Sequence, residues 1–355
     1  MKVVELPKII GEPSPNKTLH YSIGGIEKAG ALYLYHNNKT KDEIKHIVLC
    51  CAGFADDHQI FMKYASDLSK REKNTLVGVI SFPGYDHRPD FPWTKHKRDG
   101  YTFEEWILSM KDAVKLLRKE ENRMNSNGKK AKFTAVYHDW GVVYGLKYTN
   151  RVIEESSTDL IPDKVVLFDV LTSVHPKCKN VPSNVPAQSR YQIIVEHLYR
   201  VLLAVSFWIG RYVSSLLAPF VLVIGFSILG LIQLSPLYDE VDGKISRIPK
   251  VIVFDDMRRL VYMAHPYYYF LCSAVNSAFA KKLKDGMSLP LNLERTPILY
   301  MYGTDKPCDF HDLTALQLLK DTSSCKVVSV PDAGHYLYIQ QPQICLDEVI
   351  QFMNN

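Results

Sequence analysis

The feature that most constrains the fold of this chain is an alternation of strand-like and helix-like segments. Eight short apolar runs bounded by turn residues have the composition of strands; they are Thr18–Ile23, Ala31–Tyr35, His46–Cys51, Leu76–Ser81, Phe133–Val136, Val165–Asp169, Ile298–Tyr302 and Val327–Val330. Helical patterns lie between several of these runs or follow the last one; they are Phe103–Leu117, Val142–Asn150, Leu313–Leu319 and Pro342–Met353. This alternation predicts an α/β protein with a mostly parallel sheet covered by helices.

The alternation stops between about Pro176 and Pro290 and then resumes. The interrupting stretch has a helical pattern, many tyrosines and very apolar segments, and it lies between the sixth and seventh predicted strands. We therefore expect a single α/β core, formed by residues 1–175 and 291–355, with a helical insertion at 176–290. The insertion contains an apolar, membrane-prone segment at 201–234.

Composition excludes several classes of protein. Of the 355 residues, 46% are hydrophobic and 23% are charged, which are ordinary values for a globular chain. The net charge is +5 and no run of five basic residues occurs, so a nucleic-acid partner is not indicated. Seven cysteines without a C-x-x-C spacing predict reduced thiols in a cytosol-facing protein. The sequence predicts no metal site and no organic cofactor, since no ligand cluster or phosphate-binding loop occurs.

The segment YHDWG at Tyr137–Gly141 follows a buried strand and precedes a helix. A tight turn in that context lifts one side chain above the edge of the sheet, where it can act as a nucleophile. Here the lifted side chain is Asp139, and the alternative interpretation is that it only caps the helix. Backbone N–H groups of Trp140 and of Phe54, in CCAGFADDH after the third strand, could form an oxyanion hole.

A histidine near the C-terminus completes the pattern. His335 lies in DAGHYLYIQQP, after the last predicted strand and a glycine. The chain order of nucleophile, acid and histidine is that of α/β-hydrolases. No G-x-S-x-G motif occurs, so an ordinary serine esterase or lipase is disfavoured.

Together, in this order and spacing, these segments resemble the α/β-hydrolase superfamily, and most closely its epoxide hydrolase and haloalkane dehalogenase branch. The resemblance covers Thr18–Ser173 and Pro297–Met353. It implies an eight-stranded, mostly parallel sheet with a helical cap inserted after the sixth strand. It also implies that Asp139 attacks an sp³ carbon to form an alkyl-enzyme ester and that His335 activates the water that hydrolyses the ester.

The resemblance leaves two positions open for the carboxylate that orients His335. The usual place is the loop after the seventh strand, where Asp305 lies one residue earlier than expected. The other place is the end of the sixth strand, where Asp169 ends the run VVLFD. We favour Asp169 and keep Asp305 as the alternative.

Opening an epoxide also requires a proton donor to the leaving oxygen, and in this branch cap tyrosines provide it. The segment HPYYYF offers Tyr267, Tyr268 and Tyr269, which point in different directions on a helix, so at least one should face inward. The alternative is that they only pack between cap and core. A dehalogenase would instead hold a halide with N–H donors, and Trp140 is the one such donor that the sequence offers.

Several positions depart from the pattern of the branch. The oxyanion motif, usually HGxP, reads Ala52-Gly53-Phe54-Ala55, and Tyr137 stands where a small residue is usual. These departures favour a non-catalytic lipid- or membrane-binding protein that reuses the fold, whereas Asp139 and His335 favour turnover. Our leading interpretation is hydrolysis of a lipophilic epoxide; hydrolysis of a carbon–halogen or unusual ester bond is the alternative within enzymes.

Tyr212–Leu234 contains 23 residues without a charge, which is long enough to span a bilayer. A single crossing would place Asp139 and His335 on opposite sides of the membrane. The segment is therefore an interfacial or re-entrant anchor, a buried cap helix lining an apolar channel, or a hairpin of two transmembrane helices. We favour the anchor, which predicts a membrane-associated, cytosol-facing protein whose lipophilic substrate partitions from the bilayer.

Overall fold

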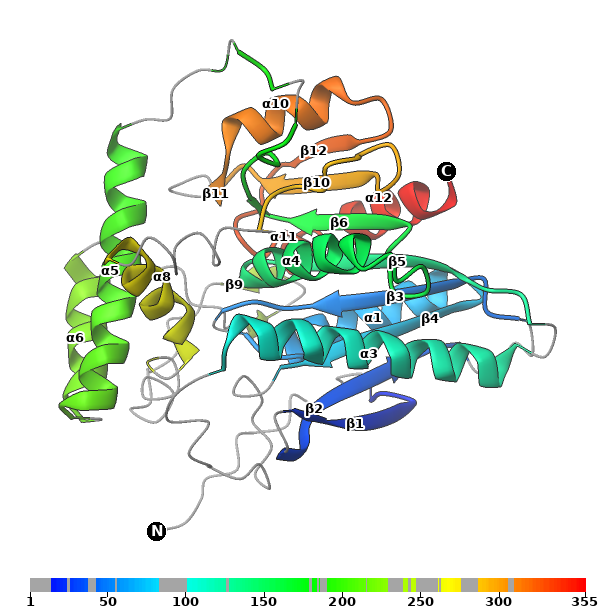
Figure 1. Ribbon diagram of the computed structural model, residues 1–355, viewed down its shortest axis with the longest axis horizontal. Helices are drawn as coiled ribbons and strands as arrows, with labels where there is room; N and C mark the ends of the chain where they lie inside the picture. The colour runs from blue at the N-terminus through cyan, green and yellow to red at the C-terminus, as the bar shows by residue number, and fades with distance from the viewer. Residues whose placement is uncertain are drawn as a thin grey trace.

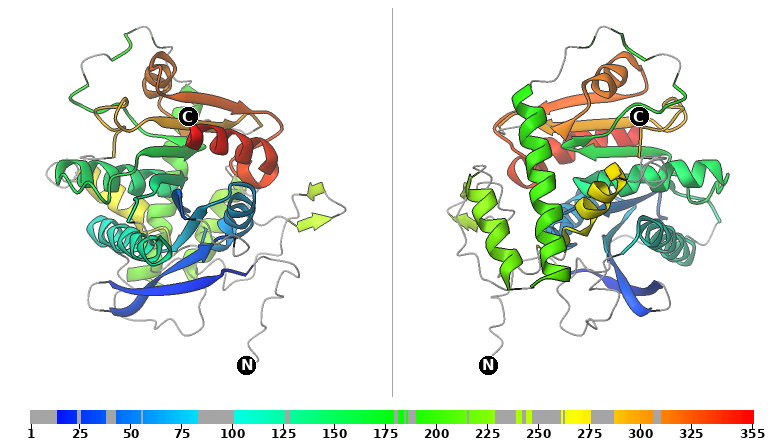
Figure 2. Two further views of the ribbon diagram at one scale, coloured as in Figure 1. Left: turned by 90° about the vertical axis from the view of Figure 1, so that its right-hand side faces the viewer. Right: turned by 60° about the vertical axis from the view of Figure 1, so that its left-hand side comes forward.

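The computed structural model describes residues 14–23, 26–37, 43–54, 56–82, 101–125, 128–178, 181–183, 185, 190–214, 216–228, 239–241, 244–246, 261, 263–275, 287–305 and 310–355. One large sheet forms its centre, and helices lie on both sides of it (Figures 1 and 2).

The sheet has eight strands. Their spatial order is β1 (Lys17–Ile23), β2 (Ile26–Tyr35), β4 (Thr75–Ser81), β3 (His46–Cys51), β5 (Lys132–His138), β6 (Lys164–Phe168), β10 (Ile298–Gly303) and β12 (Lys326–Val330). Strand β2 is antiparallel to both of its neighbours, and every pair from β4 to β12 is parallel. The predicted α/β class and mostly parallel sheet are therefore confirmed, with all eight predicted runs in one sheet.

The two faces of the sheet are covered by different helices. Helices α3 (Phe103–Met124), α4 (Trp140–Glu154) and α10 (Leu313–Asp321) pack on one face, and α1 (Gln59–Arg71) and α12 (Pro342–Asn354) pack on the other. The short helix α11 (Leu337–Gln340) precedes α12. Side chains of a strand point alternately to the two faces, so Ile47 belongs to one core and Val48 to the other. The sheet thus separates two apolar layers.

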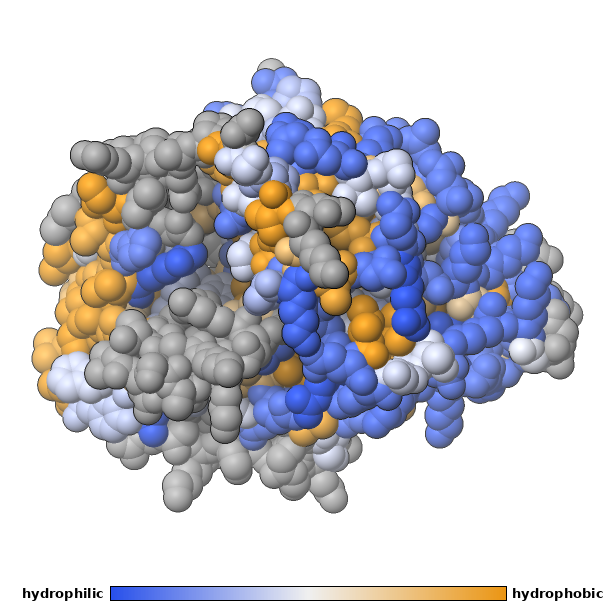
Figure 3. All heavy atoms as spheres, turned by 45° about the horizontal axis from the view of Figure 1, so that its top comes forward, coloured by the Kyte–Doolittle hydropathy of each residue, from blue (hydrophilic) through white to orange (hydrophobic). Residues whose placement is uncertain are grey.

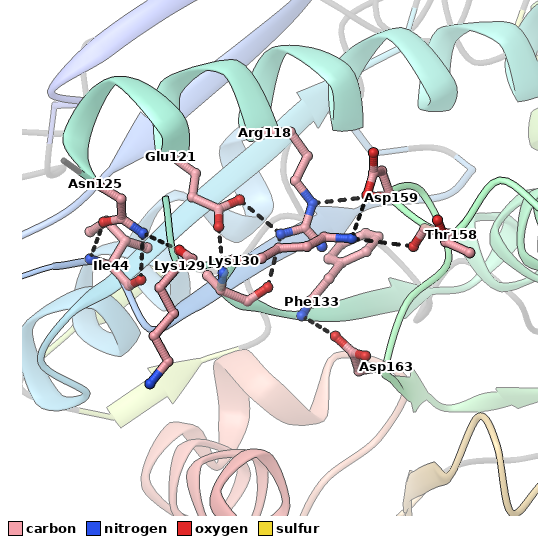
Figure 4. Close-up of polar contacts among 11 residues, drawn as sticks. Ile44, Arg118, Glu121, Asn125, Lys129, Lys130, Phe133, Thr158, Asp159 and Asp163 are labelled. Carbon is pink, nitrogen blue, oxygen red and sulfur yellow. Dashed lines mark hydrogen bonds and ion pairs between the residues drawn. The ribbon is translucent and has the colours of Figure 1, made fainter. Parts of the chain in front are cut away.

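A buried polar network fixes the carboxyl end of α3 (Figure 4). The helix begins with a capping box in which Thr102 and Glu105 bond to each other's backbone N–H. Near its other end, Arg118 forms an ion pair of 2.8 Å with the buried Glu121 and donates to the Ala131 carbonyl at 2.8 Å. Asn125 bonds to both backbone groups of Ile44, at 2.7 and 2.9 Å. These contacts join α3 to the segments that lead into β3 and β5.

Three helices come from the predicted insertion: α5 (Arg190–Tyr212), α6 (Leu217–Ile228) and α8 (His265–Val275). Figure 1 shows them grouped at one side of the sheet, beyond the ends of the parallel strands. The insertion also contains two short paired strands that the sequence did not predict, β8 (Asp239–Val241) and β9 (Lys244–Ser246). A second small sheet pairs β7 (Val170–Leu171) with β11 (Phe310–His311).

The uncharged run Tyr212–Leu234 is not one continuous helix. Helix α5 ends at Tyr212 and α6 begins at Leu217. The Ser214 hydroxyl accepts the backbone N–H groups of Leu216 and Leu217, which starts a new helix. Positions 229–234 lie outside the described residues. Within the described ranges, no helix has both the length and the apolar character that crossing a bilayer needs, so the alternative of a transmembrane hairpin is not supported.

Candidate active site

Asp139 occupies the sharp turn between β5 and α4. Its backbone has φ 52° and ψ −126°, a conformation that non-glycine residues rarely adopt and that is held only where the surroundings enforce it. The turn is packed tightly against the end of β3. A Cβ added to Gly53 would lie 2.3 Å from the Trp140 nitrogen, and one added to Gly141 would lie 2.4 Å from the Cys51 carbonyl oxygen. Only glycine therefore fits at these two close approaches, which hold Asp139 above the sheet.

The bulky Tyr137, where a small residue was expected, packs against the adjacent helix α4. Its ring lies against Gly145, where an added Cβ would approach the ring to 2.4 Å. Its hydroxyl lies 3.3 Å from the Thr149 hydroxyl. The missing side chain at Gly145 therefore offsets the large one at Tyr137, and the turn at Asp139 keeps its strained shape.

His335 lies between two carboxylates. Its Nδ1 is 2.7 Å from Oδ2 of Asp169, and its Nε2 is 3.5 Å from Oδ2 of Asp139. Asp169 follows β6, is fully buried, and accepts the Gly303 N–H at 3.2 Å through its other oxygen. Asp305, the alternative acid, is exposed, and its backbone N–H donates to the Ala333 carbonyl. The structure thus brings together Asp139, His335 and Asp169, in a chain of two contacts.

The two carboxylates control the charge of His335. Burial alone lowers the pKa of this histidine, but the hydrogen bonds to Asp139 and Asp169 outweigh it and raise the pKa to about 10. The preceding His138 behaves in the opposite way, because burial and the nearby His335 lower its pKa to about 3. The resting site therefore contains one charged imidazole and one neutral imidazole, with ring centroids 4.5 Å apart.

A third carboxyl group, Asp56, lies close to the same centre. Burial and then the negative charge of Asp139 raise the pKa of Asp56 to about 8. One carboxyl oxygen bonds to Tyr336, and Oδ2 is buried without a hydrogen-bond partner in the described part of the chain. Near neutral pH this group is mostly a neutral acid beside Asp139, so it adds little negative charge to the site.

Of the three candidate tyrosines, Tyr267 faces the turn at Asp139. Its ring makes edge contacts with Trp140, at 4.9 Å between centroids, and with Phe54, at 5.1 Å. Its hydroxyl bonds to the hydroxyl of Tyr199 on α5 and to the Trp140 side chain. Burial, then Tyr199 and Asp139, raise its pKa well above the ordinary value, so Tyr267 keeps its proton.

The other two candidate tyrosines lie elsewhere. Tyr268 packs against Phe207 of α5 at 5.4 Å between ring centroids. Tyr269 packs at 6.4 Å from Phe103 and 6.2 Å from His265. Both are only partly buried, and their contacts join the cap helices to one another and to α3.

The predicted oxyanion donors belong to the two segments that meet at Gly53. Phe54 is in the turn after β3, and Trp140 begins α4, with its backbone nitrogen close to Gly53. Oδ1 of Asp139 lies in the same place, buried and without a hydrogen-bond partner among the described residues. A helix N-terminus beside a carboxylate can stabilise negative charge that develops there.

Sequence reasoning missed four groups of the site: Asp56, His138, Tyr199 and Tyr336. His138 and Asp56 are each within three residues of a named candidate, so their nearness in the sequence to that candidate could have indicated them. Tyr199 had none, because 68 residues separate it from Tyr267 and it lies in an apolar helical pattern.

Comparisons with known proteins identify the fold. No family model matches the chain. A 1-acylglycerol-3-phosphate O-acyltransferase of Saccharomyces cerevisiae is 34% identical over 61 residues, which is 17% of this chain and 16% of that protein.

Among the solved structures that match, the following cover nearly the whole chain. A candidate epoxide hydrolase of Klebsiella pneumoniae has a TM-score of 0.56 at 15% identity, covering 96% of this chain and 98% of its own. A mutant of a candidate epoxide hydrolase of Pseudomonas aeruginosa has a TM-score of 0.53 at 15% sequence identity, and the match covers 98% of both chains. A haloalkane dehalogenase variant of Bradyrhizobium elkanii has a TM-score of 0.55 at 12% sequence identity, and the match covers 95% of this chain and 96% of its own. The protein therefore has the α/β-hydrolase fold.

Proposed function

We propose that the protein is a hydrolase that opens lipophilic epoxides through a covalent ester on Asp139. One observation carries the proposal: the strained turn holds a carboxylate whose neighbour is a histidine backed by a second, buried carboxylate. An aspartate in that position is a carbon nucleophile, whereas a serine hydrolase places a hydroxyl there. The folds of the candidate epoxide hydrolases and the dehalogenase support the same chemistry.

In the first step, a carboxylate oxygen of Asp139 attacks an epoxide carbon and the carbon–oxygen bond of the ring breaks. The leaving oxygen takes the proton of the Tyr267 hydroxyl, which Tyr199 orients by its hydrogen bond. The products are a hydroxyalkyl ester and a tyrosinate. The indole of Trp140 is engaged with Tyr267, which favours an oxygen leaving group over a halide held by that indole.

In the second step, His335 takes a proton from water, and the hydroxide attacks the ester carbonyl of Asp139. The tetrahedral oxyanion is stabilised by backbone N–H groups of Phe54 and Trp140, and its collapse releases the diol. The resting proton of His335 passes to the tyrosinate before water is activated, which makes His335 a neutral base. The proton taken from water then restores the charged His335, so the sum of both steps is epoxide plus water giving diol.

Alkylation also prepares His335 for this role. In the resting site the negative charge of Asp139 helps to raise the pKa of His335. Conversion of Asp139 to an ester removes that charge, while burial continues to lower the pKa. His335 therefore loses its proton more readily in the intermediate than in the resting enzyme, which is when a base is needed.

The test is turnover of three substrate panels by purified protein: lipophilic epoxides, haloalkanes and carboxylic esters. Wild type should release diols from epoxides, and Asp139→Asn should release none. Asp305→Asn, which changes an exposed carboxylate, is the matched control and should keep wild-type rates. If only haloalkanes or esters are turned over, Asp139 acts on carbon–halogen or ester bonds instead of epoxides. If the protein is folded and turns over none of the three panels, the non-catalytic alternative is favoured.

A further inference from the structure

Exposed large apolar side chains are concentrated on two cap helices. Of the 14 such residues in the described part of the chain, ten fall between positions 194 and 224, and each is 45% to 60% exposed. We call these ten the apolar cap face; they are Ile194, Leu198, Val201, Trp208, Tyr212, Val213, Leu216, Leu217, Phe220 and Ile224. Hydrophobic atoms accordingly gather at the left edge of the molecule in Figure 3, where Figure 1 shows α5 and α6. A patch of this extent marks an interaction surface.

The opposite faces of the same helices are part of the protein core. Leu203 and Phe207 of α5 and Leu222 of α6 are buried. Leu202 packs against Gly225, where an added Cβ would approach it to 2.3 Å, so the two helices lie in close contact. The apolar cap face is therefore the outer side of a helix pair that is already anchored by its inner side, and it does not need a partner in order to fold.

Beyond Glu196, which lies in the second turn of α5, the charge along these helices has one sign. Positions 197–228 contain Arg200 and Arg211 and no aspartate or glutamate. The two arginines are 11 residues apart, close to three helical turns, so both lie on one flank of the α5 stripe. Trp208 and Tyr212 are in the stripe itself, and such aromatic side chains favour the boundary between lipid chains and headgroups.

From these observations we propose that the apolar cap face docks on an anionic phospholipid bilayer, with the helices lying in the plane of its surface. The exposed side chains would enter the upper acyl region while the flanking arginines meet lipid phosphates. A second copy of the chain is a less suitable occupant, because two such faces would bring like charges together.

Docking in this orientation bears on the source of the substrate. Tyr199, whose hydroxyl bonds to Tyr267 in the candidate site, is on α5 between Leu198 and Val201 of the apolar cap face. A docked cap would therefore place Tyr199, which orients the proton donor Tyr267, on a helix that itself contacts the lipid, and the substrate class would be epoxides dissolved in the bilayer. This consequence rests on the proposed function, whereas docking itself does not.

The test is flotation of the full chain with vesicles of phosphatidylcholine containing 30% phosphatidylserine, and with vesicles of phosphatidylcholine alone. Wild type should float with the anionic vesicles and bind the neutral ones roughly tenfold more weakly. The triple variant Trp208→Ser, Phe220→Ser and Ile224→Ser should bind anionic vesicles roughly a hundredfold more weakly. The double variant Leu108→Ser and Leu291→Ser is the matched control, because it removes side chains of similar exposure elsewhere, and it should bind as wild type does.

Circular dichroism melting checks that both variants are folded, and size-exclusion chromatography with light scattering checks their oligomeric state. Wild type that stays at the bottom of the gradient with both vesicles would overturn the proposal, as would a triple variant that floats normally. A wild-type dimer that the triple variant converts to a monomer, without vesicle binding, would assign the face to a second copy instead. The flotation assay contains no substrate, so a negative result would not bear on the proposed chemistry of Asp139.

Discussion

Replacing Asp169 by asparagine should leave the protein folded and nearly abolish its turnover. Asparagine tolerates the backbone at this position, φ 63°, and its side-chain oxygen can accept the Gly303 N–H as Asp169 does. Its NH₂ group would then face Nδ1 of His335, which must become an acceptor. The ring proton moves to Nε2, the atom that should take a proton from water, so His335 can no longer act as the base.

The size of the effect follows from the contact that is lost. The carboxylate of Asp169 is fully buried and lies 2.7 Å from His335, so its hydrogen bond is charge-assisted and shielded from water. Loss of an equivalent carboxylate in a catalytic triad lowers the rate by about 10⁴, which corresponds to about 5.5 kcal/mol of barrier. We expect a decrease of roughly 10³- to 10⁴-fold in the steady-state rate.

Rapid-quench kinetics with a lipophilic aryl epoxide should resolve the step that is affected. His335 acts as a base only in ester hydrolysis, so Asp169→Asn should form the covalent ester in a burst of one equivalent and then stop. Asp305→Asn should retain the wild-type rate within twofold. The assignment of Asp169 is refuted if its asparagine variant loses less than tenfold, or if Asp305→Asn loses a hundredfold or more.

Three further predictions concern other groups. Tyr267→Phe should slow ester formation by about 10²-fold, since it removes the proton donor; an unchanged burst rate would exclude that role. Protonation of Asp56, whose pKa is raised from 3.8 to about 8, stabilises the fold below pH 4, and this contribution disappears as pH rises through 8. In urea unfolding, the stability of Asp56→Asn relative to wild type should therefore increase between pH 5 and pH 9. If the unfolding free energies of the two proteins instead depend on pH in the same way, the raised pKa of Asp56 is contradicted. Glu121→Ala should lose about 3–5 kcal/mol of unfolding free energy, because Arg118 is left buried and unpaired, whereas Asp112→Ala, in an exposed pair, should lose less than about 1 kcal/mol.

The sheet was predictable because its signals are local. Each strand is a short apolar run next to turn residues, and the capping box at Thr102 is fixed by residues three apart. The turn at Asp139 was predictable for the same reason, since strand, turn and helix are contiguous. The start of α6 also had a local signal, in Ser214 followed by Pro219 within the first helical turn, but the length of the uncharged run concealed it.

Relations between distant segments were not predictable in the same way. Asp169 and Asp305 both follow strands that end at the same edge of the sheet, and only the path of the backbone decides which reaches His335. Tyr199 joins the site through a hydroxyl contact between two cap helices, whose packing no local pattern encodes. Local patterns therefore indicated the candidate nucleophile and base, whereas the groups that would orient them emerged only from the fold.

The central claim is a covalent ester on Asp139, and mass spectrometry of the intact protein and its peptides tests it directly. His335→Gln should be mixed with a lipophilic epoxide, quenched in acid and digested. The account predicts a mass gain equal to one epoxide, confined to the peptide that contains Asp139 and absent from the double variant with Asp139→Asn. Folded His335→Gln protein that gains no mass, while wild type turns over the same epoxide, would contradict the account.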